Sequence, residues 1–184
     1  GGPELPEPTV PEDPRDALAL MRAVLEEAEE PVAIVATGPL TNIGLLVRDH
    51  ADLLPRVARV VWMGGSTGRG NATPYAEFNA WTDPEAIALV LDSGVDFTMV
   101  GLNISHQALI TREVRERIRR IGTRTAAFGA ERLEFCCATY EIAEHMPDGP
   151  LHDPITVAML IDPSVATTVR ARLGFGTERV CTRG

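Results

Sequence analysis

The chain has 184 residues, of which 45% are hydrophobic and 23% are charged, and this is the composition of a globular protein with a sizeable core. The net charge is −9 without any basic cluster, so we expect no nucleic-acid partner. All 17 basic residues are arginine, which excludes lysine chemistry such as Schiff-base formation or a P-loop phosphate site. No apolar run reaches the length that crosses a membrane, so we also expect no membrane partner.

The three cysteines and the two chain ends carry little functional signal. Cys136 and Cys137 are neighbours that pair only with difficulty, and the spacing matches neither a disulfide framework nor a zinc site. We therefore expect buried or idle thiols. The chain starts at Gly1 and stops at Gly184 without a cap or a polar tail, so we expect an internal piece of a longer protein.

The first part of the chain predicts two helices around one strand. Leu18, Met21 and Leu25 recur at helical spacing, and Pro31 ends this pattern. A short apolar run rich in β-branched residues follows, as in a buried strand. We expect a loop over residues 1–14, a helix over 16–29, a strand over 32–36, a turn over 37–39 and a helix over 40–47.

The same alternation continues through the second part of the chain. Asp83 followed by Pro84 is a strong helix start, because aspartate caps the first N–H groups and proline suits the first helical position. We expect a strand over 57–63, a polar glycine-rich loop over 66–79, a helix over 83–93, a strand over 97–102, helices over 111–121 and 124–145, a helix after Asp153 as N-cap, and a further strand over 165–173.

Alternating strands and helices predict an α/β fold with a mainly parallel sheet flanked by helices on both faces. No internal repeat or linker divides the chain, so we expect a single, partial domain over residues 1–184 that is incomplete at both ends. Ligands of such folds bind beyond the carboxyl ends of the strands. The loops at 37–39, at 64–79 and after Leu102 are therefore the places to look for a site.

The densest polar cluster is the loop over residues 70–79. Asn71, Glu77 and Asn79 together offer two side-chain amides and a carboxylate, which suits the several hydroxyls of a sugar. The alternative is a solvated loop whose asparagines only stabilise turns. Local chemistry leaves both readings open.

Two further segments follow strands or open helices. His152 stands beside Asp153, and histidine is the residue best suited to acid or base chemistry near neutral pH. The alternative is that Asp153 only caps a helix. The backbone carbonyl of Thr37, in the turn after the first predicted strand, is a hard oxygen ligand for a cation or else part of an ordinary turn. We expect His50 and His145 at the surface and leave the role of His106 open.

Taken together, several segments resemble the inosine-uridine-preferring nucleoside hydrolase family, in order and in spacing. The GNxTPxAEFN and HDP elements are specific in combination, and the resemblance extends over nearly the whole chain. The segments are LPEPTVPED (5–13), ATGPLTNIG (36–44), VVWMGG (60–65), GNATPYAEFNAWTDPEA (70–86), MVGLNISHQAL (99–109) and HDPITVA (152–158).

The resemblance implies hydrolysis of the N-glycosidic bond of ribonucleosides to free base and ribose, as in nucleoside salvage. It also implies a role for each matched residue. Asn71, Glu77 and Asn79 would hold ribose hydroxyls, Met63 would pack beneath the sugar, Tyr140 would line the base pocket, His152 would protonate the leaving base, and the Thr37 carbonyl and Asp153 would bind a calcium ion (Ca2+).

The chain departs from the family pattern in two places. The Asp-rich DxDxxxDD segment, which supplies most of the calcium ligands and the aspartate that activates water, does not occur in it, and Asn103 stands where many members have Asp. Two alternatives to the enzyme therefore stay open, namely a non-catalytic nucleoside- or sugar-binding relative and an inactive fragment. From the resemblance we also expect a cytoplasmic homo-oligomer, either a dimer or a tetramer.

Overall fold

The computed structural model describes residues 7–174, which form two compact units. The sheet unit contains residues 13–104 and 153–174, and the helical unit contains residues 7–12 and 105–152. The chain passes from one unit to the other three times, between Glu12 and Asp13, between Ile104 and Ser105, and between His152 and Asp153.

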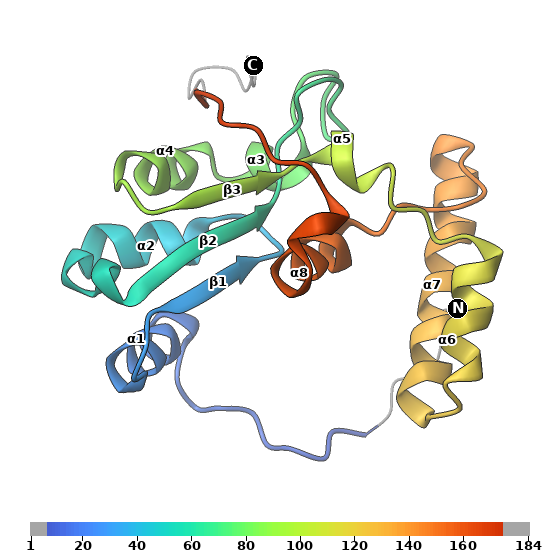
Figure 1. Ribbon diagram of the computed structural model, residues 1–184, viewed down its shortest axis with the longest axis horizontal. Helices are drawn as coiled ribbons and strands as arrows, with labels where there is room; N and C mark the ends of the chain where they lie inside the picture. Colours follow the sequence, from blue (N-terminus) through green and yellow to red (C-terminus); the bar gives the residue numbers. More distant parts are fainter. Residues whose placement is uncertain (1–6, 175–184) are drawn as a thin grey trace. The chain divides into compact units, whose positions relative to one another are not determined.

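Three parallel strands in the order β1-β2-β3 form the sheet, as predicted (Figure 1). These are β1 (Val32–Ala36), β2 (Val57–Met63) and β3 (Phe97–Val100). The register places Ala36 beside Trp62 and Met63 beside Val100, so the three carboxyl ends lie along one edge. The first two strands have the predicted bounds, whereas β3 ends two residues earlier than predicted.

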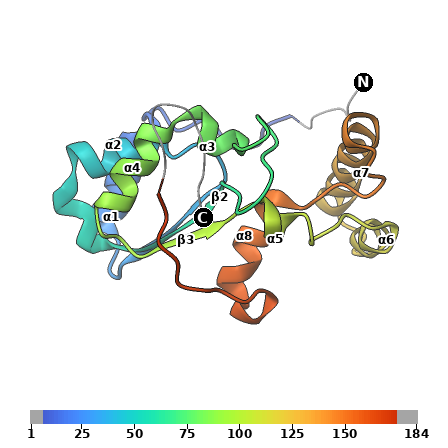
Figure 2. The ribbon, with the colours of Figure 1, turned by 90° about the horizontal axis from the view of Figure 1, so that it is seen from above.

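Helices α1, α2 and α4 cover one face of this sheet (Figure 2). Their apolar side chains, among them Leu25, Leu46 and Ile87, pack against Val60 and Trp62 of β2 in one buried core. Helix α8, of which all but the first residue belongs to the sheet unit, lies near the carboxyl ends of the strands in both views. The helices are α1 (Ala17–Glu27), α2 (Thr41–Asp49), the 3-10 helix η1 (Ala51–Arg56), α3 (Phe78–Thr82), α4 (Pro84–Asp92), α8 (His152–Ile161) and the 3-10 helix η2 (Pro163–Val165).

The helical unit is built from α6 (Arg112–Arg120) and α7 (Arg124–Glu144), which pack on each other. The short helix α5 (Leu102–Ser105) connects it to β3. Residues 108–110 run antiparallel to residues 149–151, with Ile110 N–H donating to the Gly149 carbonyl and Leu151 N–H to that of Ala108. This pairing brings the segment after β3 next to the segment that precedes α8.

Three predictions about local structure are wrong. The loop predicted over 66–79 ends early, because α3 begins at Phe78. Asp153 is not an N-cap, because α8 already begins at His152 and places Asp153 in its first turn. Within the described part of 165–173 no strand forms, since Val165 ends a 3-10 helix and the residues after it pair with no strand. Of the cysteines, Cys137 is buried and Cys136 half-buried, and Cys181 lies outside the described residues.

An open apolar groove of about 580 Å³ runs along the outer side of β1, between α1 and the start of α2. It reaches Thr37 at one end and otherwise contains none of the predicted site residues. None of the helices in residues 7–174 combines the length and the apolar character that a membrane crossing requires.

Candidate functional site

The carboxyl end of β2 turns sharply at Gly64 and Gly65, and neither position has room for a side chain. A Cβ atom on Gly64 would lie 2.0 Å from the Trp62 ring. Gly65 has a φ of 72°, in the left-handed region, and a Cβ there would lie 2.7 Å from the Met99 sulfur. The turn therefore needs glycine at both positions, and the loop with the polar cluster predicted from sequence follows it.

Glu77 holds that loop against the end of β2. Its side chain is 2% exposed, and its carboxylate accepts hydrogen bonds from the backbone N–H groups of Gly65 at 2.8 Å, Asn79 at 2.9 Å and Ala80 at 3.0 Å. The last two bonds make Glu77 the N-cap of α3. One carboxylate thus closes the turn, starts the helix and fixes the two relative to each other.

The neighbouring site residues are fixed in the same way. The Asn79 amide, 8% exposed, donates from Nδ2 to the Met63 carbonyl at 2.9 Å and contacts the Met63 sulfur at 3.7 Å. The Asn71 Oδ1 atom accepts from the Phe78 N–H at 2.9 Å, while the residue itself stays exposed. The structure therefore brings Met63, Asn71, Glu77 and Asn79 together at the carboxyl end of β2.

The two predicted metal ligands also belong to the sheet unit. Thr37 follows β1 in a turn that is fixed by the Trp62 indole, which donates to the Gly38 carbonyl at 3.0 Å. Asp153 lies in the first turn of α8, and its carboxylate has no hydrogen-bond or ion-pair partner within residues 7–174. The pKa of Asp153 is raised by partial burial, although the residue as a whole stays exposed. A carboxylate in this state gains from a nearby cation.

These residues do not complete a metal site by themselves. The described part of the chain contains no cluster of three or more His, Cys, Asp or Glu side chains suited to holding a metal ion. Thr37 and Asp153 are both oxygen donors, the kind that calcium prefers, but calcium takes about six to eight of them. Thr37 and Asp153 therefore offer the kind of ligand atom that calcium prefers, but two ligands are too few to hold the ion.

His152 lies between two hydroxyl groups of the helical unit. Its Nδ1 atom shares a hydrogen bond with Ser105 Oγ at 2.8 Å, and its Nε2 atom shares one with Tyr140 Oη at 2.6 Å. The His106 ring lies 5.6 Å away between centroids. Burial, and then the neighbouring His106, lower the pKa of His152 to about 4. The imidazole is therefore neutral near pH 7.

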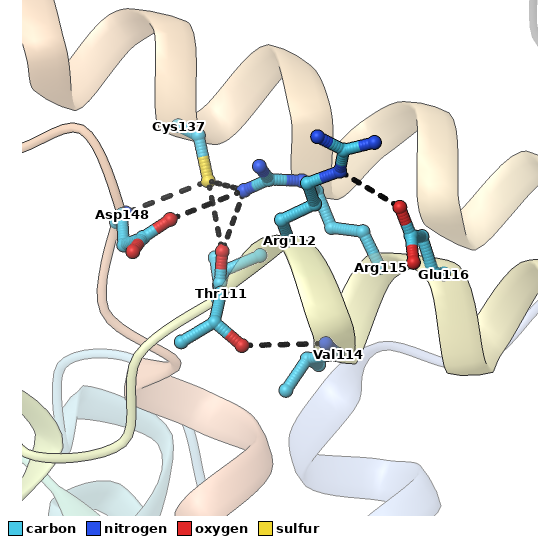
Figure 3. Close-up of polar contacts among 9 residues, drawn as sticks. Thr111, Arg112, Val114, Arg115, Glu116, Cys137 and Asp148 are labelled. Carbon is cyan, nitrogen blue, oxygen red and sulfur yellow. Dashed lines mark hydrogen bonds and ion pairs between the residues drawn. The ribbon is translucent and has the colours of Figure 1, made fainter.

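A partly buried polar cluster joins α7, the helix that carries Tyr140, to α6 (Figure 3). The Arg115 guanidinium of α6 donates to the Cys137 sulfur of α7 at 3.1 Å and to the Ile110 carbonyl at 2.6 Å, and it pairs with Asp148 at 3.5 Å. The same sulfur accepts from the Gly149 N–H at 3.4 Å. Cys137 is thus not idle, because it ties α6, α7 and the loop before α8 together.

Sequence reasoning missed Ser105 and the Arg115 cluster. Ser105 is separated from His152 by 47 positions, and only the antiparallel pairing of 108–110 with 149–151 brings them together. The one available signal was the position of Ser105 and His106 directly after a strand, where ligands of α/β folds gather.

The comparisons with known proteins agree with this geometry. The family model described as inosine-uridine preferring nucleoside hydrolase matches residues 1–184. The chain is 44% identical over 184 residues to the pyrimidine-specific ribonucleoside hydrolase RihA of Klebsiella pneumoniae (strain 342), covering 100% of this chain and 59% of that protein. This chain therefore spans somewhat more than half the length of that curated relative.

Two solved structures share the fold. The purine-preferring ribonucleoside hydrolase from Gardnerella vaginalis matches with a TM-score of 0.88 and 29% identity, over 98% of this chain and 59% of that one. The plant nucleoside hydrolase PpNRh1 matches with a TM-score of 0.85 and 29% identity, over 95% of this chain and 56% of that one. The chain belongs to the inosine-uridine preferring nucleoside hydrolase family. The predicted family and fold are confirmed.

Proposed function

We propose that the full-length protein hydrolyses the N-glycosidic bond of ribonucleosides, with pyrimidine ribonucleosides as its preferred substrates. Family membership supports the reaction, and the 44% identity to a pyrimidine-specific relative supports the preference. The observation that carries the proposal is the cluster of Asn71, Glu77, Asn79 and Met63 at the carboxyl end of β2, held by hydrogen bonds to backbone.

The cluster has polar atoms left over for a sugar. Asn79 uses only its Nδ2 group, which leaves Oδ1 as an acceptor, and Asn71 uses only Oδ1, which leaves an NH2 donor. Glu77 accepts three of about four hydrogen bonds that a carboxylate takes. Breaking the bond to the base builds positive charge on the sugar, and the Glu77 carboxylate would stabilise that charge. These residues would bind and orient ribose.

His152 would supply the departing base with a proton. Because the ring is neutral near pH 7, it carries a single N–H hydrogen, and both of its nitrogens are engaged with hydroxyls. The hydrogen would therefore reach the base through Tyr140, which passes its O–H hydrogen to the base and takes the hydrogen of the imidazole. The water that attacks the sugar loses a proton in the same reaction, and this proton would return to the imidazole and leave it neutral again. Such general acid assistance contributes ~10²–10⁴-fold to the rate.

Calcium is part of the proposal for the full-length protein. Thr37, through its carbonyl, and Asp153 would be two of its ligands, and the other ligands would come from outside the described residues. A bound calcium ion would supply a positive charge that orients ribose hydroxyls and acidifies water.

The comparison of two variants tests this proposal. In the full-length protein, Asp153→Ala should weaken calcium binding by at least about tenfold and abolish uridine hydrolysis, because losing one ligand of a hard cation costs affinity directly. Asn79→Ala should reduce uridine hydrolysis and leave the calcium affinity unchanged, since its amide contacts sugar. Calorimetric titration with calcium and assays of free uracil measure both effects.

Asp162→Ala is the matched control, because Asp162 also precedes a proline but caps η2 with a bond to Ser164 N–H. It should change neither calcium affinity nor hydrolysis. Equal calcium affinity in Asp153→Ala and the unsubstituted protein would remove Asp153 from the metal site. A full-length protein that binds uridine without releasing uracil would point to the non-catalytic binding relative.

The 184-residue chain alone should show no nucleosidase activity. Its described residues offer two candidate calcium ligands where the ion needs about six to eight. The measurement is release of uracil or hypoxanthine from uridine or inosine by the purified chain with added calcium. Calcium-dependent turnover by this chain would show that the 184 residues hold the ion without further protein, and the proposed need for additional ligands would be wrong.

We further propose that the full-length protein is cytoplasmic and acts as a dimer or tetramer in nucleoside salvage, in line with the family resemblance. Sedimentation of the purified protein measures the oligomeric state.

A further inference from the structure

The hydroxyl of Ser105 has a single place to donate its hydrogen. Ser105 is 0% exposed, and within residues 7–174 the only hydrogen-bond partner of its Oγ atom is His152 Nδ1 at 2.8 Å. A buried O–H group without an acceptor costs about 1–3 kcal/mol. The hydroxyl therefore donates to Nδ1, and Nδ1 accepts.

The direction of this bond determines the rest of the chain of hydrogen bonds. If Nδ1 accepts, it carries no hydrogen, so the ring hydrogen is on Nε2, which then donates to Tyr140 Oη at 2.6 Å. The opposite tautomer would have Tyr140 donating to Nε2 and Nδ1–H donating to Ser105, and would leave the buried serine hydrogen without an acceptor. Tyr140 is half-buried, and within residues 7–174 the only hydrogen-bond partner of its hydroxyl is His152, so its own O–H hydrogen is not taken by another acceptor of the described chain.

We propose that Ser105 is a positioning residue, which fixes His152 in the Nε2–H tautomer and thereby makes the Tyr140 O–H the hydrogen offered to the leaving base. This inference rests on the proposed function, since it names the residue that orients the acid of that reaction. All three residues belong to the helical unit, and they come from three different helices. Ser105 is the last residue of α5, Tyr140 lies on α7, and His152 is the first residue of α8.

The first test is independent of catalysis. Nitrogen-15 NMR of the full-length protein, labelled at histidine, reports which ring nitrogen of His152 carries hydrogen at neutral pH. We expect a protonated Nε2 and an unprotonated Nδ1. In Ser105→Ala the two tautomers should mix, whereas Ser105→Thr, which keeps the hydroxyl, should restore the Nε2–H form. A protonated Nδ1 in the unsubstituted protein, or an unchanged tautomer in Ser105→Ala, overturns the inference.

The second test is kinetic. Ser105→Ala should lower kcat for uridine about tenfold, the usual effect of one lost hydrogen bond, and change kcat for a nitrophenyl riboside less than about twofold. Ser105→Thr should restore most of the uridine activity. Tyr140→Phe, which removes the outer hydroxyl, should reproduce the substrate-dependent loss while leaving the Ser105–His152 bond intact.

The two proposals fail in different ways. If His152→Ala slows uridine and the nitrophenyl riboside equally, the acid role in the proposed function is wrong, while the tautomer measured by NMR still decides whether Ser105 orients the ring. If His152→Ala does discriminate between the substrates but Ser105→Ala leaves kcat for uridine unchanged, the positioning role of Ser105 is wrong.

Discussion

Replacing His152 with alanine should slow the full-length enzyme by ~10²–10⁴-fold on inosine and uridine and much less on a nitrophenyl riboside. A purine or pyrimidine departs poorly as an anion, so its loss needs a proton, whereas nitrophenolate leaves readily without one. The ribose-binding cluster keeps its hydrogen bonds in this variant, because none of them involves His152. The measurement is kcat for all three substrates in both enzymes.

His50→Ala is the matched control for this experiment. His50 is a half-buried histidine at the C-cap of α2, and it belongs to the sheet unit, whereas the hydroxyls that bind His152 belong to the helical unit. It should leave all three rates unchanged. Because the pKa of His152 is lowered to about 4, the rate on uridine should fall as the pH drops below about 4, where Nδ1 gains a hydrogen and no longer accepts from Ser105, and it should show no His152 titration near 6.5. Equal losses on the three substrates in His152→Ala would mean that this residue positions sugar or metal and donates no proton.

The second large effect concerns stability. Glu77→Ala should lower the free energy of unfolding of the chain by about 3 kcal/mol, since it leaves three backbone N–H groups without their buried acceptor. Glu77→Gln should lose roughly half as much, because one amide oxygen can accept from the Gly65 and Ala80 N–H groups, while its NH2 group faces the backbone N–H of Asn79, which then has no acceptor. Urea denaturation at constant slope measures both losses.

Asp16→Ala provides the comparison for an ordinary cap. Asp16 is the exposed N-cap of α1 and accepts from Ala19 N–H alone at 2.7 Å, so its loss should be about 1 kcal/mol. If Glu77→Ala loses no more free energy of unfolding than Asp16→Ala, Glu77 does not hold the loop against the end of β2. The residue would then be available entirely to a ligand.

Elements whose signal is local could be predicted from the sequence. Strands β1 and β2 were predicted with the observed bounds, because each is a short apolar run between breaking residues. The start of α4 was predicted because Asp83 caps it through Ala86 N–H, a bond within one turn. The strand expected over 165–173 was wrong, since a β-branched run forms a strand only where another strand pairs with it.

For the candidate site, the sequence indicated which residues of the loop lie together and did not indicate most of their interactions. The polar residues of the loop over 70–79 do gather at a strand end, as expected. The start of α3 was missed because the carboxylate that caps it also accepts from Gly65, which lies 12 positions away. The capping role expected for Asp153 was wrong, and the carboxylate has no such partner in the first turn of α8. Ser105 carries no signal near His152 in sequence.

The division of the chain into two contact units has a consequence for protein engineering. On the proposed function, the ribose contacts lie within residues 63–79 of the sheet unit, whereas Ser105, Tyr140 and the imidazole lie in the helical unit. The hydrogen bonds that hold the ribose-binding residues involve neither Ser105, Tyr140 nor His152, and the hydrogen bonds of His152 involve none of the ribose-binding residues. On the proposed function, variants of α7 residues should therefore change the selectivity for the leaving group and leave the affinity for the sugar unchanged. The two properties can then be selected in separate rounds.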